Sequence, residues 1–371
     1  MWLIIFAVSI LAGVACALYI ADKIAKTGVF SFTDKGALVK ILSVLAVVVI
    51  ALLLCFIFDI TNTIVIFMHF AVFMLAGDLV LFIAKKVSGR ELPAGRAQLI
   101  AIAACFIYLC IGWILMHGLW ETDYLIETDK QVGKFRIAQI ADTHVGCGFT
   151  GKEFGEKLEK VQAADPDILV ITGDLVDDGT MKADMVDACA ALGKFRTKYG
   201  IYFCLGNHDL GYYSSERRGY SGEELIAELE KNGVHVLRDE GVLIDGRVYL
   251  IGRNDAGYGT SSRASAKALM QGIDPDVYTV MLDHQPTDYD AEAAAGVDLV
   301  LSGHTHGGQL FPLEYIQPLV SSNDNVRGLE RRGRTDFIVT DGFSDWEIKF
   351  KTGCKSEYNI IVVEQGRTAG K

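Results

Sequence analysis

The sequence lacks the features that mark several classes of protein. Its 371 residues include 35 Lys and Arg against 46 Asp and Glu, so the formal net charge is −11 at pH 7. A chain of that sign gains no affinity for nucleic acid from counterion release, and we expect no nucleic-acid partner. The eight cysteines have no C-x-x-C spacing, which argues against a disulfide framework and against a Cys-rich zinc site. The sequence also contains no internal repeat or low-complexity segment, so a repeat architecture is excluded.

Charge is scarce in the first 120 residues, which hold 8 of the Lys and Arg and 5 of the Asp and Glu. Four apolar stretches in this region are each close to the ~20 residues that cross a bilayer. A cleaved secretory signal is disfavoured, because the first stretch has no basic n-region and three more follow. A buried helical bundle is the other alternative. We predict that residues 1–120 form a transmembrane region of about four helices, built on Trp2–Ile20, Ile41–Phe58, Ile64–Ile83 and Leu99–Met116.

The basic residues of this region are divided unequally among its loops. Four lysines lie between the first and second stretches, and four basic residues lie between the third and fourth. The loop between the second and third stretches has none, and Glu121-Thr122-Asp123 follows the fourth. By the positive-inside rule the two basic loops are cytoplasmic. We therefore expect an integral protein of the cell membrane whose acidic remainder lies outside the cytoplasm.

After an expected linker at 121–134, residues 135–371 have the pattern of an α/β domain. Short apolar runs at Phe135–Ile140, Ile168–Thr172 and Ile201–Leu205 alternate with segments of helical spacing. From Val234 onwards the chain is richer in strands. Alternating units followed by a strand-rich half predict two packed sheets with helices outside.

Polar side chains follow five of the predicted strands directly. Loops at the carboxyl ends of strands are where α/β enzymes place their chemistry, so these side chains are candidates for one site. Five of the eight histidines of the chain lie in these loops. The candidate metal ligands are Asp142, His144, Asp174, Asn207, His284, His304 and His306.

A mixture of imidazole, carboxylate and amide suits a first-row transition metal better than Mg²⁺ or Ca²⁺, whose sites are built from oxygen. Seven ligands are too many for one tetrahedral ion, and two ions that share a carboxylate would use them well. We expect two divalent ions, of Mn, Fe, Zn or Ni. Coordination can lower the pKa of water from ~15.7 to about 7 and so provide a hydroxide nucleophile at neutral pH.

The motifs D-x-H, G-D-x-x-D, G-N-H-D, H and G-H-x-H occur in this order, and they resemble those of the calcineurin-like metallophosphoesterases. Gly303-His304-Thr305-His306-Gly307-Gly308-Gln309 and His284-Gln285-Pro286 resemble the membrane-anchored bacterial members. The resemblance covers roughly Phe135–Val363 and implies a four-layer α/β/β/α sandwich, here preceded by four transmembrane helices. It implies a first metal held by Asp142, His144, Asp174 and His306. It implies a second metal held by Asp174, Asn207, His284 and His304.

The resemblance also implies that His208 is not a ligand but contacts the phosphate and protonates the leaving oxygen, with Asp177 behind it. Asp178 stands where related phosphoprotein phosphatases carry an arginine, which favours a singly charged diester or pyrophosphate link over a monoester. Arg253 is a candidate replacement for that arginine.

The expected function is thus a membrane-anchored phosphodiester or pyrophosphate hydrolase, whose substrates include lipid-linked or envelope-precursor esters. The alternative is a metal-binding membrane sensor or scaffold that keeps the fold without catalysis.

Overall fold

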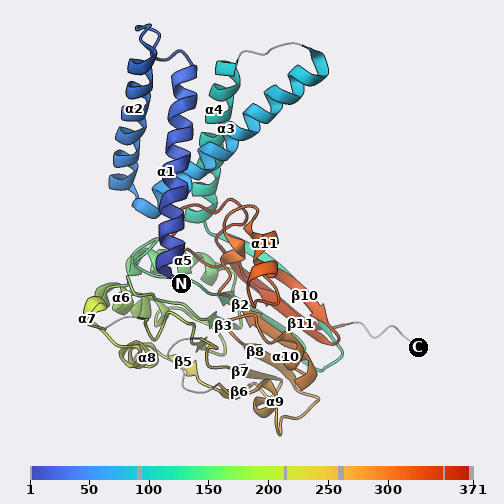
Figure 1. Cartoon of the computed structure of the whole chain (residues 1–371). Helices are drawn as coiled ribbons and strands as arrows, with labels where there is room; N and C mark the ends of the chain where they lie inside the picture. Colours follow the sequence, from blue (N-terminus) through green and yellow to red (C-terminus); the bar gives the residue numbers. More distant parts are fainter. Residues whose placement is uncertain (1, 90–93, 213–214, 258–262, 346, 367–371) are drawn as a thin grey trace. The chain divides into compact units, whose positions relative to one another are not determined.

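The computed structural model describes residues 2–89, 94–212, 215–257, 263–345 and 347–366. The chain divides into two compact units. A helical unit comprises Met1–Ile114 together with Glu347–Phe350, and a second unit comprises Leu115–Trp346 with Lys351–Lys371. Figure 1 labels elements of each unit where there is room.

The helical unit has four helices that are long and apolar enough to cross a membrane. Their outer faces expose many large apolar side chains, a surface that suits lipid rather than water. The four predicted spans therefore correspond to helices. These are α1 (Trp2–Lys26), α2 (Gly36–Ile57), α3 (Ile60–Ser88) and α4 (Ala94–His117).

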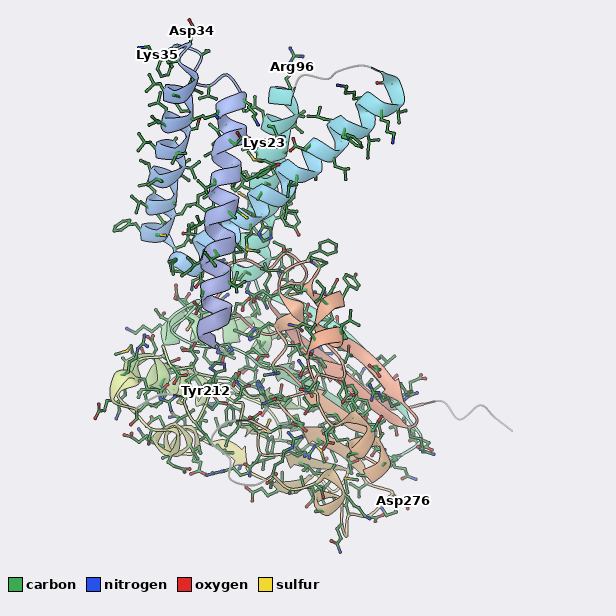
Figure 2. All side chains as sticks on the ribbon, in the orientation of Figure 1. Lys23, Asp34, Lys35, Arg96, Tyr212 and Asp276 are labelled. Carbon is green, nitrogen blue, oxygen red and sulfur yellow. The ribbon has the colours of Figure 1, made fainter. Side chains whose placement is uncertain are left out.

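A polar cluster around Asp78 joins three of these helices. The Asp78 carboxylate accepts hydrogen bonds from Tyr19 on α1 at 2.8 Å and from Gln98 on α4 at 2.6 Å. Lys23, labelled in Figure 2, forms an ion pair with the same carboxylate. A charge inside a span is tolerated when it is paired in this way, so the cluster fixes how the helices pack.

The segment Glu347–Phe350 packs within the helical unit, although it lies far along the chain. Asn62 donates to the carbonyl of Glu347 at 2.9 Å, and the Lys349 amide donates to Asn62 at 2.8 Å. The Phe350 ring lies 5.9 Å from the rings of both Phe58 and Trp113. The neighbouring Trp346 lies outside the described residues.

The second unit contains two six-stranded sheets. The first has the order β1-β12-β2-β3-β4-β5, and all its strand pairs are parallel except β12 with β2. The expected linker at 121–134 is largely a strand, because β1 pairs along its whole length with β12. The strands of this sheet are β1 (Trp120–Thr128), β12 (Glu357–Gln365), β2 (Lys134–Ile140), β3 (Ile168–Thr172), β4 (Ile201–Cys204) and β5 (Val234–Leu237).

The second sheet has the order β10-β11-β9-β8-β7-β6, with antiparallel pairs at its two ends. The edge strand β10 has the polar sequence Gly-Leu-Glu-Arg-Arg. The strands are β6 (Glu240–Ile244), β7 (Val248–Gly252), β8 (Tyr278–Leu282), β9 (Leu299–Ser302), β10 (Gly328–Arg332) and β11 (Thr335–Val339).

The strand β3 shows how the layers are held, because its alternate side chains enter different cores. Leu169 and Ile171 join α5, α6 and α8 in one core, whereas Ile168 and Val170 join residues of the second sheet in another. A third core packs α9 and α10 against the second sheet. The unit is therefore the expected four-layer α/β/β/α sandwich (Figure 1).

The helices of this unit are mostly short, and several begin at a capping residue. Thr150 and Ser221 each form a capping box with a glutamate three residues on, at the starts of α5 and α8. The helices are α5 (Gly151–Ala163), α6 (Lys182–Leu192), α7 (Ser215–Arg218), α8 (Gly222–Lys231), α9 (Ala266–Leu269), α10 (Tyr289–Ala295) and α11 (Leu313–Val320), with a 3₁₀ turn η1 (His306–Gly308).

Candidate metal centre

All seven predicted ligands come together where strands of the two sheets end. The loops after β2, β3 and β4 carry Asp142, His144, Asp174 and Asn207, and those after β8 and β9 carry the other three histidines. Two overlapping groups have ligand atoms within 4.8 Å of one another and could each hold a metal ion. These groups are Asp142, His144 and His306, and Asp142, Asp174 and His284.

In the first group, His306 Nε2 lies 3.7 Å from Asp142 Oδ1. The rings of His144 and His306 stack with their centroids 5.2 Å apart. His144 Nε2 lies 3.8 Å from Asp174 Oδ2, so the Asp174 carboxylate reaches this group as well.

In the second group, the same Asp174 Oδ2 lies 3.2 Å from His284 Nε2. Asn207 Oδ1 lies 3.1 Å from His284 Nε2 and 2.8 Å from His304 Nδ1. Asp142 is the residue common to the two groups, and Asp174 lies within 4 Å of a histidine in each.

The burial of these side chains tests whether a metal fits. His144 is fully buried, and neither of its ring nitrogens has a hydrogen-bond partner among the described residues. A buried imidazole with two unsatisfied nitrogens is costly unless another group binds it. Burial lowers the pKa of His144 to about 4 and that of His304 to about 3, so both rings are neutral at pH 7 and have lone pairs for a cation. The donor set therefore fits first-row metals.

Burial and neighbouring charges also shift the pKa values of the carboxylates and of His284. Burial raises the pKa of Asp142 to about 7. Burial also opposes charge on Asp174 and His284, but their mutual attraction at 3.2 Å outweighs it, lowering the pKa of Asp174 and raising that of His284. A bound cation would favour the charged form of both carboxylates.

Neighbouring groups fix the orientation of two ligands. His284 Nδ1 lies 2.8 Å from the carbonyl oxygen of Thr172, which leaves Nε2 to face Asp174. The amide nitrogen of Asn207 donates to the hydroxyl of Tyr212 at 2.7 Å, so its oxygen turns toward the histidines. Figure 2 labels Tyr212.

The backbone at this edge is strained. Five of the seven ligands have φ between 40° and 73°, in the left-handed region that non-glycine residues rarely adopt. Glycines allow the close approach that follows, because a Cβ at Gly206 would lie 2.2 Å from Asp174 Oδ1 and one at Gly303 would lie 2.5 Å from Asp142 Oδ2. The five strained residues are Asp142, His144, Asp174, His304 and His306.

Asp209 joins two of the ligand loops from inside. Its carboxylate accepts the backbone amides of Asp174 at 2.9 Å, Leu175 at 3.0 Å and Gly206 at 2.7 Å. Burial, together with the nearby Asp174 charge, raises the pKa of Asp209 to about 7. Asp209 therefore positions the loops after β3 and β4. Its place in the G-N-H-D motif is equally compatible with direct contact with a metal or substrate, so the sequence alone does not reveal this supporting role.

A second supporting carboxylate comes from the loop after β11. Asp345 Oδ1 lies 3.6 Å from His306 Nδ1, on the opposite side of the ring from the atom that faces Asp142. In the same loop, the buried Lys351 donates to the carbonyls of Asp341, at 2.5 Å, and Gly342. Gly342 is close to the site, because a Cβ there would lie 3.1 Å from that of Asp142. No sequence motif predicts these contacts.

The predicted proton donor and its partner lie beside the first group. The backbone amide of His208 donates to Asp174 Oδ1 at 2.8 Å, and the ring centroids of His208 and His144 are 5.1 Å apart. Asp177 accepts the amide of Gly179 at 2.5 Å, and its other oxygen lies 4.0 Å from His144 Nδ1. The structure thus places Asp177 against His144.

Arg253 does not serve as a phosphate clamp. Its guanidinium is 2% exposed and pairs with Asp283 at 2.9 Å, Asp288 at 3.0 Å and Glu292 at 3.0 Å. The terminal nitrogens of Arg253 are therefore paired with two buried carboxylates and with the partly exposed Asp288, so this candidate replacement for the arginine is not free to bind a phosphate.

Comparison with known proteins agrees with this geometry. Residues 135–308 match the family model of calcineurin-like phosphoesterases. An uncharacterized metallophosphoesterase of Aquifex aeolicus is 32% identical over 223 residues, which cover 58% of this chain and 80% of that protein. One from Helicobacter pylori is 30% identical over 280 residues, covering 72% of this chain and 71% of the relative. The chain belongs to the calcineurin-like phosphoesterases.

A relative from Bos taurus is named as a transmembrane protein with metallophosphoesterase domain. It is 28% identical over 249 residues, and the match covers 63% of this chain and 54% of that protein. The chain therefore spans about half the length of this relative. Together with the four apolar helices, the relative's name supports integration of this phosphoesterase in a membrane.

Proposed function

We propose that this protein is a membrane-anchored, dinuclear-metal hydrolase of phosphodiester or pyrophosphate bonds, including those of lipid-linked or envelope-precursor esters. The observation that carries the proposal is the pair of overlapping ligand groups at the sheet edge, with both nitrogens of the buried His144 unsatisfied by the described residues. A structural metal site typically has four protein ligands, mostly cysteine thiolates. Mixed oxygen and nitrogen ligands around two ions are instead suited to hydrolysis.

Each ion would be held by four side chains, with Asp174 common to both. Bound divalent ions would lower the pKa of a coordinated water and draw charge from the phosphoryl oxygens. The first ion would be held by Asp142, His144, Asp174 and His306. The second would be held by Asp174, Asn207, His284 and His304.

His208 is the proposed proton donor to the leaving oxygen. Its ring is half-buried beside His144 and Tyr212, with centroid distances of 5.1 and 5.0 Å. An imidazole protonates an alkoxide leaving group effectively near neutral pH. Asp177, through its contacts with His144 and the loop at Gly179, would keep this part of the site in place.

The charges around the site favour a singly charged phosphoryl group. Asp178 accepts the amide of Tyr212 at 3.0 Å and so stays near the Asn207 loop. Arg253 pairs with interior carboxylates, and Arg218 donates to carbonyls of Asp209 and Tyr220. Neither arginine is directed to a dianion, so a diester or pyrophosphate link is preferred.

The test uses the purified full chain, stripped of metal and reloaded with Mn²⁺. We expect hydrolysis of a soluble nitrophenyl phosphodiester that exceeds hydrolysis of the matching monoester and disappears when chelator is added. A protein that binds two ions but hydrolyses neither ester would instead support the alternative, a metal-binding sensor or scaffold.

We further propose that the catalytic unit lies outside the cytoplasm, on the grounds of loop charge. Asp34, in the first basic loop, and Asp276, in the second unit, are both exposed and labelled in Figure 2. Cysteine introduced at Asp276, but not at Asp34, should react with a membrane-impermeant maleimide on intact cells, in a background lacking other accessible cysteines. The reverse pattern would place the site in the cytoplasm.

A further inference from the structure

The helix α11 presents an apolar surface that no described part of the chain covers. None of its eight residues is buried. Leu319 is 82% exposed, Val320 77% and Tyr315 65%, and Phe311 just before the helix is 57% exposed. Such a cluster in one short element marks a site of interaction with another apolar surface.

The start of α11, here called its base (residues 309–314), is nevertheless attached to the rest of the second unit by polar contacts. The Phe311 amide donates to the Thr352 hydroxyl at 3.2 Å, and the Gly353 amide donates to the Gln309 carbonyl at 3.0 Å. At the start of the helix, Glu314 pairs with Arg327 at 3.3 Å. Polar contacts thus fix one side of this element, while the apolar side chains remain exposed.

The last transmembrane helix ends close to that base. The Ser356 amide donates to the Leu115 carbonyl at 2.9 Å, and the Ser356 hydroxyl donates to the Met116 carbonyl at 2.6 Å. Ser356 is four residues from Thr352, a separation of at most about 14 Å even in an extended chain. The candidate span ends at His117, so Ser356 ties the segment that follows Thr352 to the residues that close this span.

The same element is continuous with the metal centre. Only a few residues separate α11 from His306, and Gly308 packs so tightly on Glu314 that a Cβ would lie 2.7 Å from the Glu314 Cα. A surface that binds α11 would therefore lie close to the His306 loop.

We propose that α11 and Phe311 insert into the bilayer interface and hold the metal centre at the level of lipid headgroups. A short helix with aromatic and aliphatic side chains on its exposed face is suited to this position. The bilayer is the favoured occupant, because the chain is already anchored in it a short distance from the base of α11. The substrate would then be a phosphoester whose apolar part stays in the membrane, an assignment that rests on the proposed function.

The insertion can be measured directly on the full chain in phospholipid vesicles. An environment-sensitive fluorophore is attached at Leu319→Cys, or at Leu243→Cys as the control, in a background without other cysteines. Leu243 is an apolar residue of β6 that is 51% exposed. Nitroxide-labelled lipids should quench the probe at 319 strongly and the probe at 243 weakly. Equal, weak quenching at both positions would overturn the proposal.

A second measurement compares two substrates with the native cysteines retained. The variant Leu319→Ser/Val320→Ser should lower kcat/KM for a phosphodiester of a lipid in vesicles by roughly a hundredfold, the loss expected when two buried aliphatic side chains are removed. It should leave hydrolysis of a soluble nitrophenyl diester unchanged, as should the Leu243→Ser control with both substrates. An equal effect on the two substrates would contradict a role in reaching lipid.

The quenching and hydrolysis measurements together distinguish failure of this inference from failure of the proposed function. If neither diester is hydrolysed by the Mn²⁺-loaded parent, the catalytic proposal fails, whatever the quenching shows. If the soluble diester is hydrolysed but the probe at 319 is not quenched, α11 does not enter the bilayer. Cross-linking of two Leu319→Cys chains through the introduced thiol would instead assign the surface to a second copy and overturn the bilayer assignment.

Discussion

The two sheets of the second unit contribute different side chains to the same candidate metal centre. The loops of the first sheet supply every predicted oxygen ligand, namely Asp142, Asp174 and Asn207, together with His144. The loops of the second sheet supply only imidazoles. Neither sheet alone carries a complete set for an ion, so we infer that metal binding is coupled to the packing of one sheet on the other.

The most severe test removes the oxygen ligand that both ions would share. Asp174→Asn should lower activity by more than about a hundredfold. Mutation of a group that only supports a metal ligand typically costs 10–100-fold, and loss of the ligand itself should cost more. Metal content should fall to one ion or none per chain. Asp178→Asn is the matched control and should retain two. Two tightly bound ions in the Asp174 variant would refute the bridging role.

The second test asks whether the first sheet contributes a histidine that is not a ligand. His208→Ala should keep both ions but lower kcat by roughly 10²–10⁴, the range for general acid–base groups. The loss should be smaller for a nitrophenyl ester, because its leaving group needs less protonation. Loss of an ion from this variant would move His208 into the ligand set, and an equal loss with all leaving groups would remove its acid role.

The third test measures the coupling between the sheets as stability. Each ion at 100 times its dissociation constant would stabilise the unit by about 2.7 kcal/mol, so chelation of both should lower its Tm by roughly 10–20 °C. The variant His284→Ala/His304→Ala, which lacks two second-sheet ligands, should show a smaller shift. A Tm that does not respond to chelator would show that the sheets dock independently of metal.

The smallest expected effect concerns Asp345, whose carboxylate lies beside the ring of the predicted second-sheet ligand His306. Asp345→Asn should weaken one of the two Mn²⁺ binding equilibria about tenfold, because a carboxylate behind a ligating histidine orients the ring and raises its basicity. Titration followed by electron paramagnetic resonance provides the readout, and the other equilibrium serves as the internal control. Unchanged affinity at both would make the 3.6 Å contact with His306 incidental.

The clustering of the candidate ligands was predictable because each of their loops follows an apolar run with the length of a buried strand. Asp142 after Phe135–Ile140 and Asp174 after Ile168–Thr172 are examples, and parallel strands bring such ends to one edge of a sheet. The assignment of roles within the set, including those of His208 and Asp177, remains a prediction.

Other features were not predictable because their signals are not local. β1 alternates exposed and partly buried residues and resembles a linker until β12, far along the chain, pairs with it. Asp345 approaches His306 only through the packing of a late loop. The left-handed backbone of the ligands is likewise imposed by tertiary contacts, since a local sequence of this kind does not specify it.

The position of β12 between β1 and β2 has a consequence for biosynthesis. Trp120, which pairs with Glu357, emerges from the ribosome 237 residues earlier (357 − 120). At about 5–20 residues per second, β1 waits roughly 10–50 s for its partner, while the span before it is already available to the membrane. The first sheet of the second unit is therefore completed only after translation is nearly finished. A chain truncated before β12 would leave β1 unpaired and one edge of β2 exposed, a substrate for proteolytic quality control at the membrane.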